Sequence, residues 1–128
     1  LLPFQPTQLV NDMYAAADVC IAPLRSGFSH DTVPSKIYTA MAAARPVVAS
    51  AEPDTETARL LRESEAGSCV LPESAAALGN GIRALRADPE RASLLGENGR
   101  QWIVDNYSRE VVVSVYDRMT RDVAAVQV

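Results

Sequence analysis

The sequence has few of the residues on which most catalytic and metal sites depend. It contains one histidine, His30, and two cysteines, Cys20 and Cys69, among 128 residues. A single imidazole excludes a metal site built on histidines, and neither a serine–histidine–aspartate set nor a cysteine–histidine pair is present. Each cysteine lies in an apolar run, which favours buried free thiols of a cytoplasmic protein over a disulfide.

A basic excess and long apolar runs are also missing. Lys and Arg total 12 against 16 Asp and Glu, and the formal net charge is −4. Proteins that bind nucleic acid through its phosphates carry a basic stripe, so we expect no nucleic-acid partner. No run approaches the ~18 apolar residues of a membrane span, and no signal peptide is visible. The 48% apolar and 22% charged residues are typical of a soluble globular protein.

The chain opens on an unusual apolar segment. Its length suits one domain, yet it starts Leu1-Leu2-Pro3-Phe4, with neither an initiator Met nor a polar lead-in. Such an opening is typical of a strand. We therefore expect a piece of a longer protein, a single partial domain over 1–128 whose first residues end a strand.

Short apolar runs alternate with helix patterns along the chain. The runs cover 18–23, 46–50 and 68–71 and are typical of buried parallel strands. Helices are expected at 6–17, 34–43, 55–65, 74–87, 89–105 and 108–126. The alternation predicts an α/β fold, an incomplete Rossmann-like parallel sheet of three to four strands with flanking helices and a helical C-terminal third.

Three residues are expected to mark helix ends. Pro34 suits the first helical position, Thr55 suits an N-cap, and Gly67 suits the stop of the helix over 55–65. The aromatic residues of the last helices are expected in the core rather than in a stacking platform; they are Trp102, Tyr107 and Tyr116.

The start of the helix after the first strand is the candidate anion site. Ligands of parallel sheets bind beyond the carboxyl ends of the strands, which directs attention to residues 24–33 and 50–55. Free N–H groups and the helix dipole favour an anion there, and Ser35 and Lys36 would complete a phosphate or diphosphate cradle. In the alternative, Ser35 only caps the helix and Lys36 is solvated.

The same two loops hold further polar residues, each with two interpretations. His30 is a solvated loop residue or contacts the ligand. Asp31 accepts hydrogen bonds from sugar hydroxyls or caps the helix. Glu52, Asp54 and Glu56 suit the start of the next helix through its dipole, or one of them contacts a sugar hydroxyl.

A set of short motifs follows a fixed order. It reads Tyr14-Ala15-Ala16-Ala17-Asp18-Val19, Pro23-Leu24, Pro34-Ser35-Lys36-Ile37, Met41-Ala42-Ala43 and Arg45-Pro46-Val47-Val48-Ala49-Ser50, then Asp88-Pro89, Leu95-Gly96, Asn98-Gly99-Arg100 and Tyr107-Ser108. This order resembles the C-terminal domain of GT-B glycosyltransferases over nearly the whole chain. It is most similar to family-four (group 1) retaining enzymes, in particular the amino-sugar transferases whose helix begins Pro-Ser-Lys.

The resemblance implies that this domain binds a nucleotide sugar, with UDP favoured as the nucleotide. The diphosphate would face Val33, Ser35 and Lys36 at the helix start. Further loop contacts would come from Gly27, Ser29 and His30.

The resemblance also assigns roles to three positions that depart from the family. The family often has two Glu separated by seven residues, and the matching positions are Asp31 and Thr39. Asp31 would keep the contact to the donor sugar. Thr39 is expected among the nucleotide-sugar contacts as well, although it offers no carboxylate to the ribose, as is common in the Pro-Ser-Lys subgroup. Gly is usual where Ala44 stands, and a left-handed Ala44 would cost on the order of 1 kcal/mol.

The implied reaction transfers the sugar to a hydroxyl acceptor with retention. No metal or cofactor beyond the substrate nucleotide sugar is implied. The catalytic groups and any membrane association would lie in an N-terminal half outside this chain, which alone should be inactive. The strand over 18–23 would be an exposed edge open to self-association, and the helix over 108–126 would pack locally or on a neighbour. A non-catalytic interaction module and a sugar-nucleotide epimerase of the same fold are the alternatives.

Overall fold

The computed structural model describes residues 3–27 and 33–126. The elements in chain order are η1 (Thr7–Leu9), α1 (Val10–Ala15), β1 (Cys20–Pro23), α2 (Ser35–Ala42), β2 (Val47–Ser50), α3 (Glu56–Glu63), β3 (Gly67–Val70), α4 (Ala75–Ala87), α5 (Pro89–Tyr107) and α6 (Arg109–Val126). The alternation of strands and helices, and the helical last third, are as predicted, so the α/β fold class is confirmed.

The described strands form one parallel sheet in the order β1-β2-β3. The register aligns Pro23 with Ser50, and Ser50 with Val70, so all three strands end at one carboxyl edge. β2 lies in the centre and is buried along its whole length, which explains its continuous apolar sequence.

The strand expected at the chain start is not seen in its described half. Leu1 and Leu2 lie outside the described residues, Phe4 belongs to no strand, and its side chain is 95% exposed. β1 is therefore an edge of the described sheet. The amides of Cys20 and Leu24 donate to the carbonyls of Pro46 and Ser50, on the side of β1 that faces β2. The backbone nitrogen of Pro23 points the other way, toward the open edge, so its missing N–H removes no hydrogen bond of the sheet.

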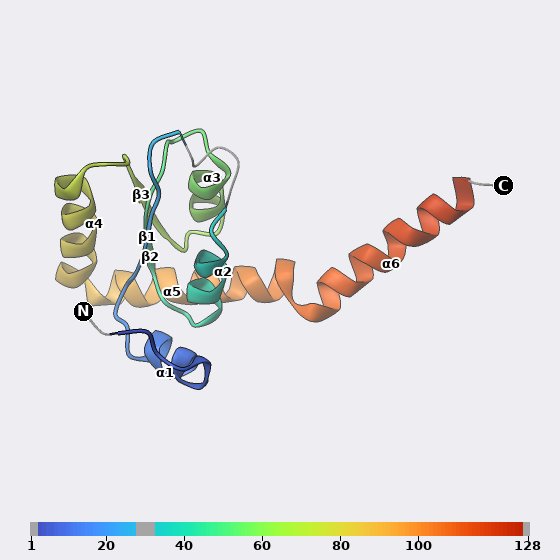
Figure 1. The fold of residues 1–128 in the computed structure, drawn as a ribbon, viewed down its shortest axis with the longest axis horizontal. Helices are drawn as coiled ribbons and strands as arrows, with labels where there is room; N and C mark the ends of the chain where they lie inside the picture. Colours follow the sequence, from blue (N-terminus) through green and yellow to red (C-terminus); the bar gives the residue numbers. More distant parts are fainter. Residues whose placement is uncertain (1–2, 28–32, 127–128) are drawn as a thin grey trace.

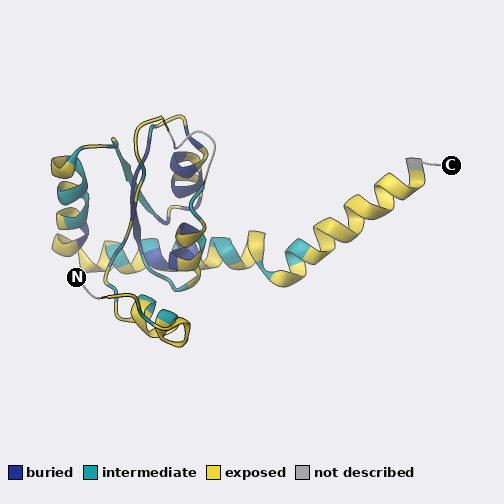
Figure 2. Cartoon of the chain, viewed as in Figure 1, coloured by how far each residue is buried: buried dark blue, intermediate teal, exposed yellow. Residues whose placement is uncertain are grey.

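Helices cover both faces of the sheet (Figure 1). α2 and α3 lie on one side, α4 lies on the other, and α5 crosses below the strands. The core between these layers is built on side chains that are almost fully buried, namely Ile37, Met41, Val47, Val48 and Leu61. Figure 2 shows this buried centre in β2, α2 and α3. Burying each such side chain stabilises the fold by about 1.5–3 kcal/mol.

Gly67 has a different role from the one predicted. α3 ends at Glu63 with Ser64 as its C-cap, and the left-handed residue that follows is Glu65, with φ 49°. Gly67 instead begins β3, where an added β-carbon would overlap the main chain of Val47 in the neighbouring strand. Close approach of the two strands therefore requires glycine at this position.

Both cysteines are free thiols, as the apolar runs around them predicted. Cys20 lies on β1 and Cys69 on β3, and each is partly buried. Burial is the main cause that raises the pKa of each thiol. The charge of Arg45 opposes this rise at Cys20, and a hydrogen bond to the Ala51 backbone opposes it at Cys69.

Local packing, one of the two placements expected for α6, is not seen. It meets α5 at the bend after Tyr107 and then projects away from the sheet and its helices (Figures 1 and 2). Tyr107 and Tyr116 are 48% and 64% exposed, so the core positions predicted for them are wrong, whereas Trp102 packs against the core. None of the helices within residues 3–27 and 33–126 is both long enough and apolar enough to cross a membrane.

Candidate functional site

The connections that follow β1 and β2 are joined at the carboxyl edge of the sheet. The amide of Leu24 donates to the main-chain oxygen and to Oγ of Ser50, both at 3.1 Å. Oγ of Ser50 in turn donates to the Leu24 carbonyl at 3.3 Å. The two connections therefore leave the sheet side by side, as expected for parallel strands that end in register.

Glu52 extends this junction. Its Oε1 accepts hydrogen bonds from Oγ of Ser26 and from the amide of Gly27, each at 2.9 Å. Gly27 has φ +77°, the left-handed region that glycine enters without strain. Glu52 thus holds the turn formed by Ser26 and Gly27, which precede it in the sequence by 26 and 25 residues. The sequence placed it only among the acids that suit a helix dipole or a sugar hydroxyl.

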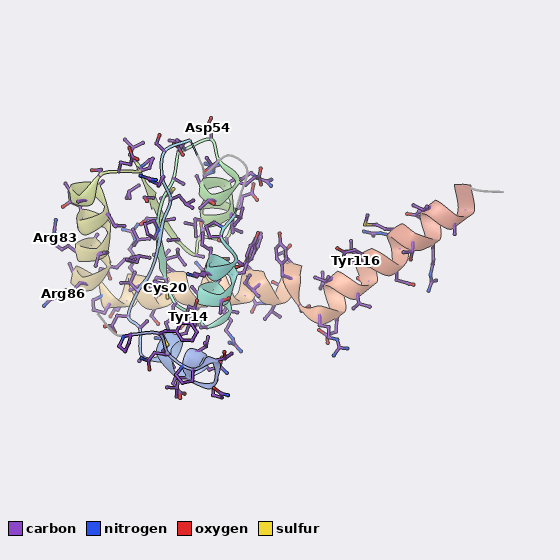
Figure 3. The ribbon with its side chains drawn as sticks, viewed as in Figure 1. Tyr14, Cys20, Asp54, Arg83, Arg86 and Tyr116 are labelled. Carbon is purple, nitrogen blue, oxygen red and sulfur yellow. The ribbon has the colours of Figure 1, made fainter. Side chains whose placement is uncertain are left out.

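The other two acids of this loop have separate positions. Glu56 lies in the first turn of α3 and pairs with Arg59 on the helix surface. Asp54 is exposed at the carboxyl edge, at the tip of the loop (Figure 3). Thr55 caps α3 as predicted, because its Oγ1 accepts a hydrogen bond from the Ala58 amide at 3.3 Å.

The first turn of α2 begins one residue later than predicted. Pro34 is the N-cap, with ψ 123°, and Ser35 is the first helical residue. Ser35 therefore does not cap the helix, and Pro34 carries no side-chain acceptor that would cap it. Ser35 and Lys36 are exposed, whereas the next residue, Ile37, is 1% exposed and anchors the helix start to the core. The helix thus presents a hydroxyl and an ammonium group at the carboxyl edge.

Thr39 lies one turn further along α2 and is exposed. Its Oγ1 donates to the Ser35 carbonyl at 3.4 Å. Burial and the charge of Cys20 raise the pKa of Tyr14 on α1, and hydrogen bonding with the nearby Thr39 side chain opposes this rise. Figure 3 shows Tyr14 close below Cys20. The contact between α1 and α2 at Thr39 was not foreseen from the sequence.

The remaining predicted site residues divide into two groups. Val33 is half-buried and packs against the core, and Gly27 is fixed by Glu52. Ser29, His30 and Asp31 lie outside the described residues.

Two cavities lie away from the start of α2. One, of about 720 Å³, is found at the amino ends of β1 and β2 and includes Asp18, Arg45 and Arg86 in its lining. The other, of about 420 Å³, lies between α3 and β3 and includes Pro53, Arg62 and Cys69. Neither is lined by Ser35, Lys36 or Thr39.

Two comparisons with known proteins give matches. The model of the family described as glycosyl transferases group 1 matches residues 1–88. The solved structure of a sucrose-phosphate synthase from Thermosynechococcus elongatus is similar with a TM-score of 0.77 and 31% identity, over 89% of this chain. The chain spans 27% of that protein. No curated protein sequence matches significantly.

Proposed function

The chain belongs to the group 1 glycosyl transferases and has their GT-B fold, and from this premise we propose that it binds the nucleotide-sugar donor of a retaining transferase. The donor carries UDP, and its sugar goes to a hydroxyl acceptor. The Pro34-Ser35-Lys36 start of α2 supports membership of the amino-sugar subgroup. The catalytic groups come from a part of the enzyme outside this chain.

The single observation that carries this proposal is the exposed start of α2. An N-cap without a side-chain acceptor, a helix dipole and the Lys36 ammonium meet at the carboxyl edge of a parallel sheet. As the sugar leaves, negative charge grows on the diphosphate, and preorganised donors stabilise it. Ser35 and Lys36 act on the diphosphate, while Asp31, Ser29, His30, Val33 and Gly27 complete the donor contacts.

The partners and location follow the same proposal. The chain binds a nucleotide sugar and no nucleic acid, works in the cytoplasm, and approaches membranes only through the rest of the enzyme. The open edge of β1, where Ile21 is 52% exposed, is its surface for self-association. A clean monomer in gel filtration at high protein concentration would contradict self-association through β1.

A titration of the chain with UDP, GDP and UDP-N-acetylglucosamine, followed by protein NMR, tests the donor site. We expect shifts at residues 24–27 and 33–36, with UDP stronger than GDP, and a loss of affinity of about tenfold or more in Lys36→Ala. Arg83→Ala is the matched control, because Arg83 is an exposed cation on the outer side of α4 (Figure 3). Unchanged spectra at millimolar nucleotide would contradict the proposal.

One observation favours a second function. Thr39 stands where the family often has a carboxylate, and its hydroxyl already bonds within the chain. A chain that kept the fold and lost the donor site would act as a non-catalytic interaction module. The same titration separates the two functions, since the module binds no UDP.

A further inference from the structure

Glu52 places a carboxylate at the edge of the sheet where the diphosphate is proposed to bind. The start of α2 and the Glu52 loop both follow the carboxyl ends of adjacent strands. A negative side chain near an anion site raises the energy of the bound anion. The presence of Glu52 there is explained instead by the two hydrogen bonds that it accepts.

We propose, resting on the function proposed above, that Glu52 is a positioning residue for donor binding. It holds the Ser26-Gly27 turn in the conformation from which the connection to α2 begins. It acts through the loop and does not itself touch the donor.

The geometry of the turn shows why such a residue is needed. Oε1 of Glu52 receives both the Ser26 hydroxyl and the Gly27 amide at 2.9 Å, so one oxygen fixes a side chain and the backbone together. A β-carbon added at Gly27 would have no heavy atom within 4 Å, so the turn is not held by packing around that position. Hydrogen bonds to a charged acceptor supply the constraint instead.

Glu52 is itself held by a rigid element. Its carbonyl accepts hydrogen bonds from Oγ1 of Thr55 at 2.7 Å and from the Thr55 amide at 3.2 Å. Thr55 is 2% exposed and caps α3, which packs on β2 and β3. The start of α3, which follows the adjacent strand β2, therefore fixes the position of the turn after β1.

Positioning and electrostatics predict opposite effects of substitution. If Glu52 acts only as a nearby charge, Glu52→Ala and Glu52→Gln both bind UDP more tightly. If it positions the turn, Glu52→Ala weakens UDP binding by about 5- to 10-fold, because the turn must be ordered on binding. Glu52→Gln stays within about twofold of the unmodified chain, since its amide oxygen still accepts from Gly27.

The experiment measures the Kd of UDP for the full chain and these variants, and the hydrogen exchange of the Gly27 amide. Ser26→Ala, which removes one of the two bonds, should weaken binding by about two- to threefold and have no further effect in the Glu52→Ala background. Asp54→Asn removes the same charge from an exposed position of the same loop and reports the purely electrostatic effect. Thermal melting of each variant shows that it is folded.

The outcomes separate this inference from the function on which it rests. Three results together support the positioning role: weaker UDP binding in Glu52→Ala, about tenfold faster exchange of the Gly27 amide in that variant, and unchanged UDP affinity in Glu52→Gln. UDP binding that is unchanged or tighter in Glu52→Ala overturns it alone. No UDP binding by the unmodified chain overturns the proposed function and this inference together. If Glu52→Ala fails to fold, unchanged binding in Ser26→Ala decides against the inference.

Discussion

Gly96 of α5 lies directly against the main-chain carbonyl of Ala44, in the turn that joins α2 to β2. A β-carbon at position 96 would overlap that carbonyl oxygen. One turn further along α5, Nη1 of Arg100 donates to the Ala42 carbonyl at 2.7 Å. The end of α2 is thus held to α5 through its backbone, which fixes the helix whose other end carries the candidate site.

The first prediction concerns this contact. Gly96→Ala should lower the free energy of unfolding by about 2–3 kcal/mol, because the new β-carbon separates α5 from the Ala44 turn. Urea denaturation followed by circular dichroism measures the loss.

Gly79→Ala is the matched control for Gly96→Ala. Within α4, a β-carbon at position 79 would meet only the end of the flexible Arg83 side chain, at 3.3 Å. Helix propensity should then stabilise this variant by up to about 1 kcal/mol. Equal stability of the two variants would show that the Ala44 turn yields without cost.

The second prediction concerns the backbone of Ala44. Its φ is 54°, in the left-handed region anticipated from the glycine that is usual in the family at this position. Ala44→Gly should therefore raise the free energy of unfolding by about 1 kcal/mol. The neighbour Ala43 has φ −83°, so Ala43→Gly should instead lower stability by about 0.5–1 kcal/mol. A loss of stability in both variants would contradict the strain at Ala44.

The third prediction is a loss of stability at high pH. Burial is the main cause that raises the pKa of Tyr38 to about 12, aided by its hydrogen bond to Tyr107 and by the charge of Glu56. The ring of Tyr107 lies 5.1 Å from that of Tyr38. Because the folded state holds this proton more tightly than the unfolded chain, the contribution of Tyr38 is complete below pH 10 and is lost as the pH rises from 10 to 12.

Absorbance at about 295 nm, where tyrosinate absorbs, should follow this titration. One of the four tyrosines should ionise near pH 12, and that step should disappear in Tyr38→Phe. Urea midpoints measured between pH 9 and 11 should fall less steeply in Tyr38→Phe than in the unmodified chain. An identical titration in the variant would assign the step to another residue.

The fourth prediction concerns the thiols. Because burial raises the pKa of both Cys20 and Cys69, the folded chain should react with a thiol reagent at pH 8 at least about tenfold more slowly than the unfolded chain. Cys20→Ser and Cys69→Ser assign the two rates. Rapid reaction of either thiol in the folded chain would show that it is accessible as thiolate.

The order of the elements could be predicted because local patterns determine it. Continuous apolar runs specify the buried strands, and prolines and caps such as Thr55 place most helix ends within one or two residues. The role of Gly67 could not be predicted, since it depends on the backbone of Val47 in another strand. Pro34 suits both the N-cap and the first helical position, and the sequence alone does not distinguish them.

The candidate site was predictable only in part, for the same reason. Ser35 and Lys36 follow a strand and a loop directly, so their place at the carboxyl edge follows from local order. Glu52 was visible as an acid, but its partners Ser26 and Gly27 lie on another connection. The apolar positions of α6 follow the same period as those of a packed helix, so its projection from the fold could not be foreseen.

The exposed arm formed by α6 makes the energetics of this chain uneven. Its 18 residues extend for about 27 Å, and a solvated helix of that length is only marginally stable in water. Amide hydrogens along α6 therefore exchange through local fraying, whereas those of β2 exchange only when the sheet unfolds. Thermal melting should accordingly show a gradual early loss of helix signal ahead of a single sharp transition. The early loss reports the unwinding of α6, and the sharp transition reports the unfolding of the sheet and the helices packed on it.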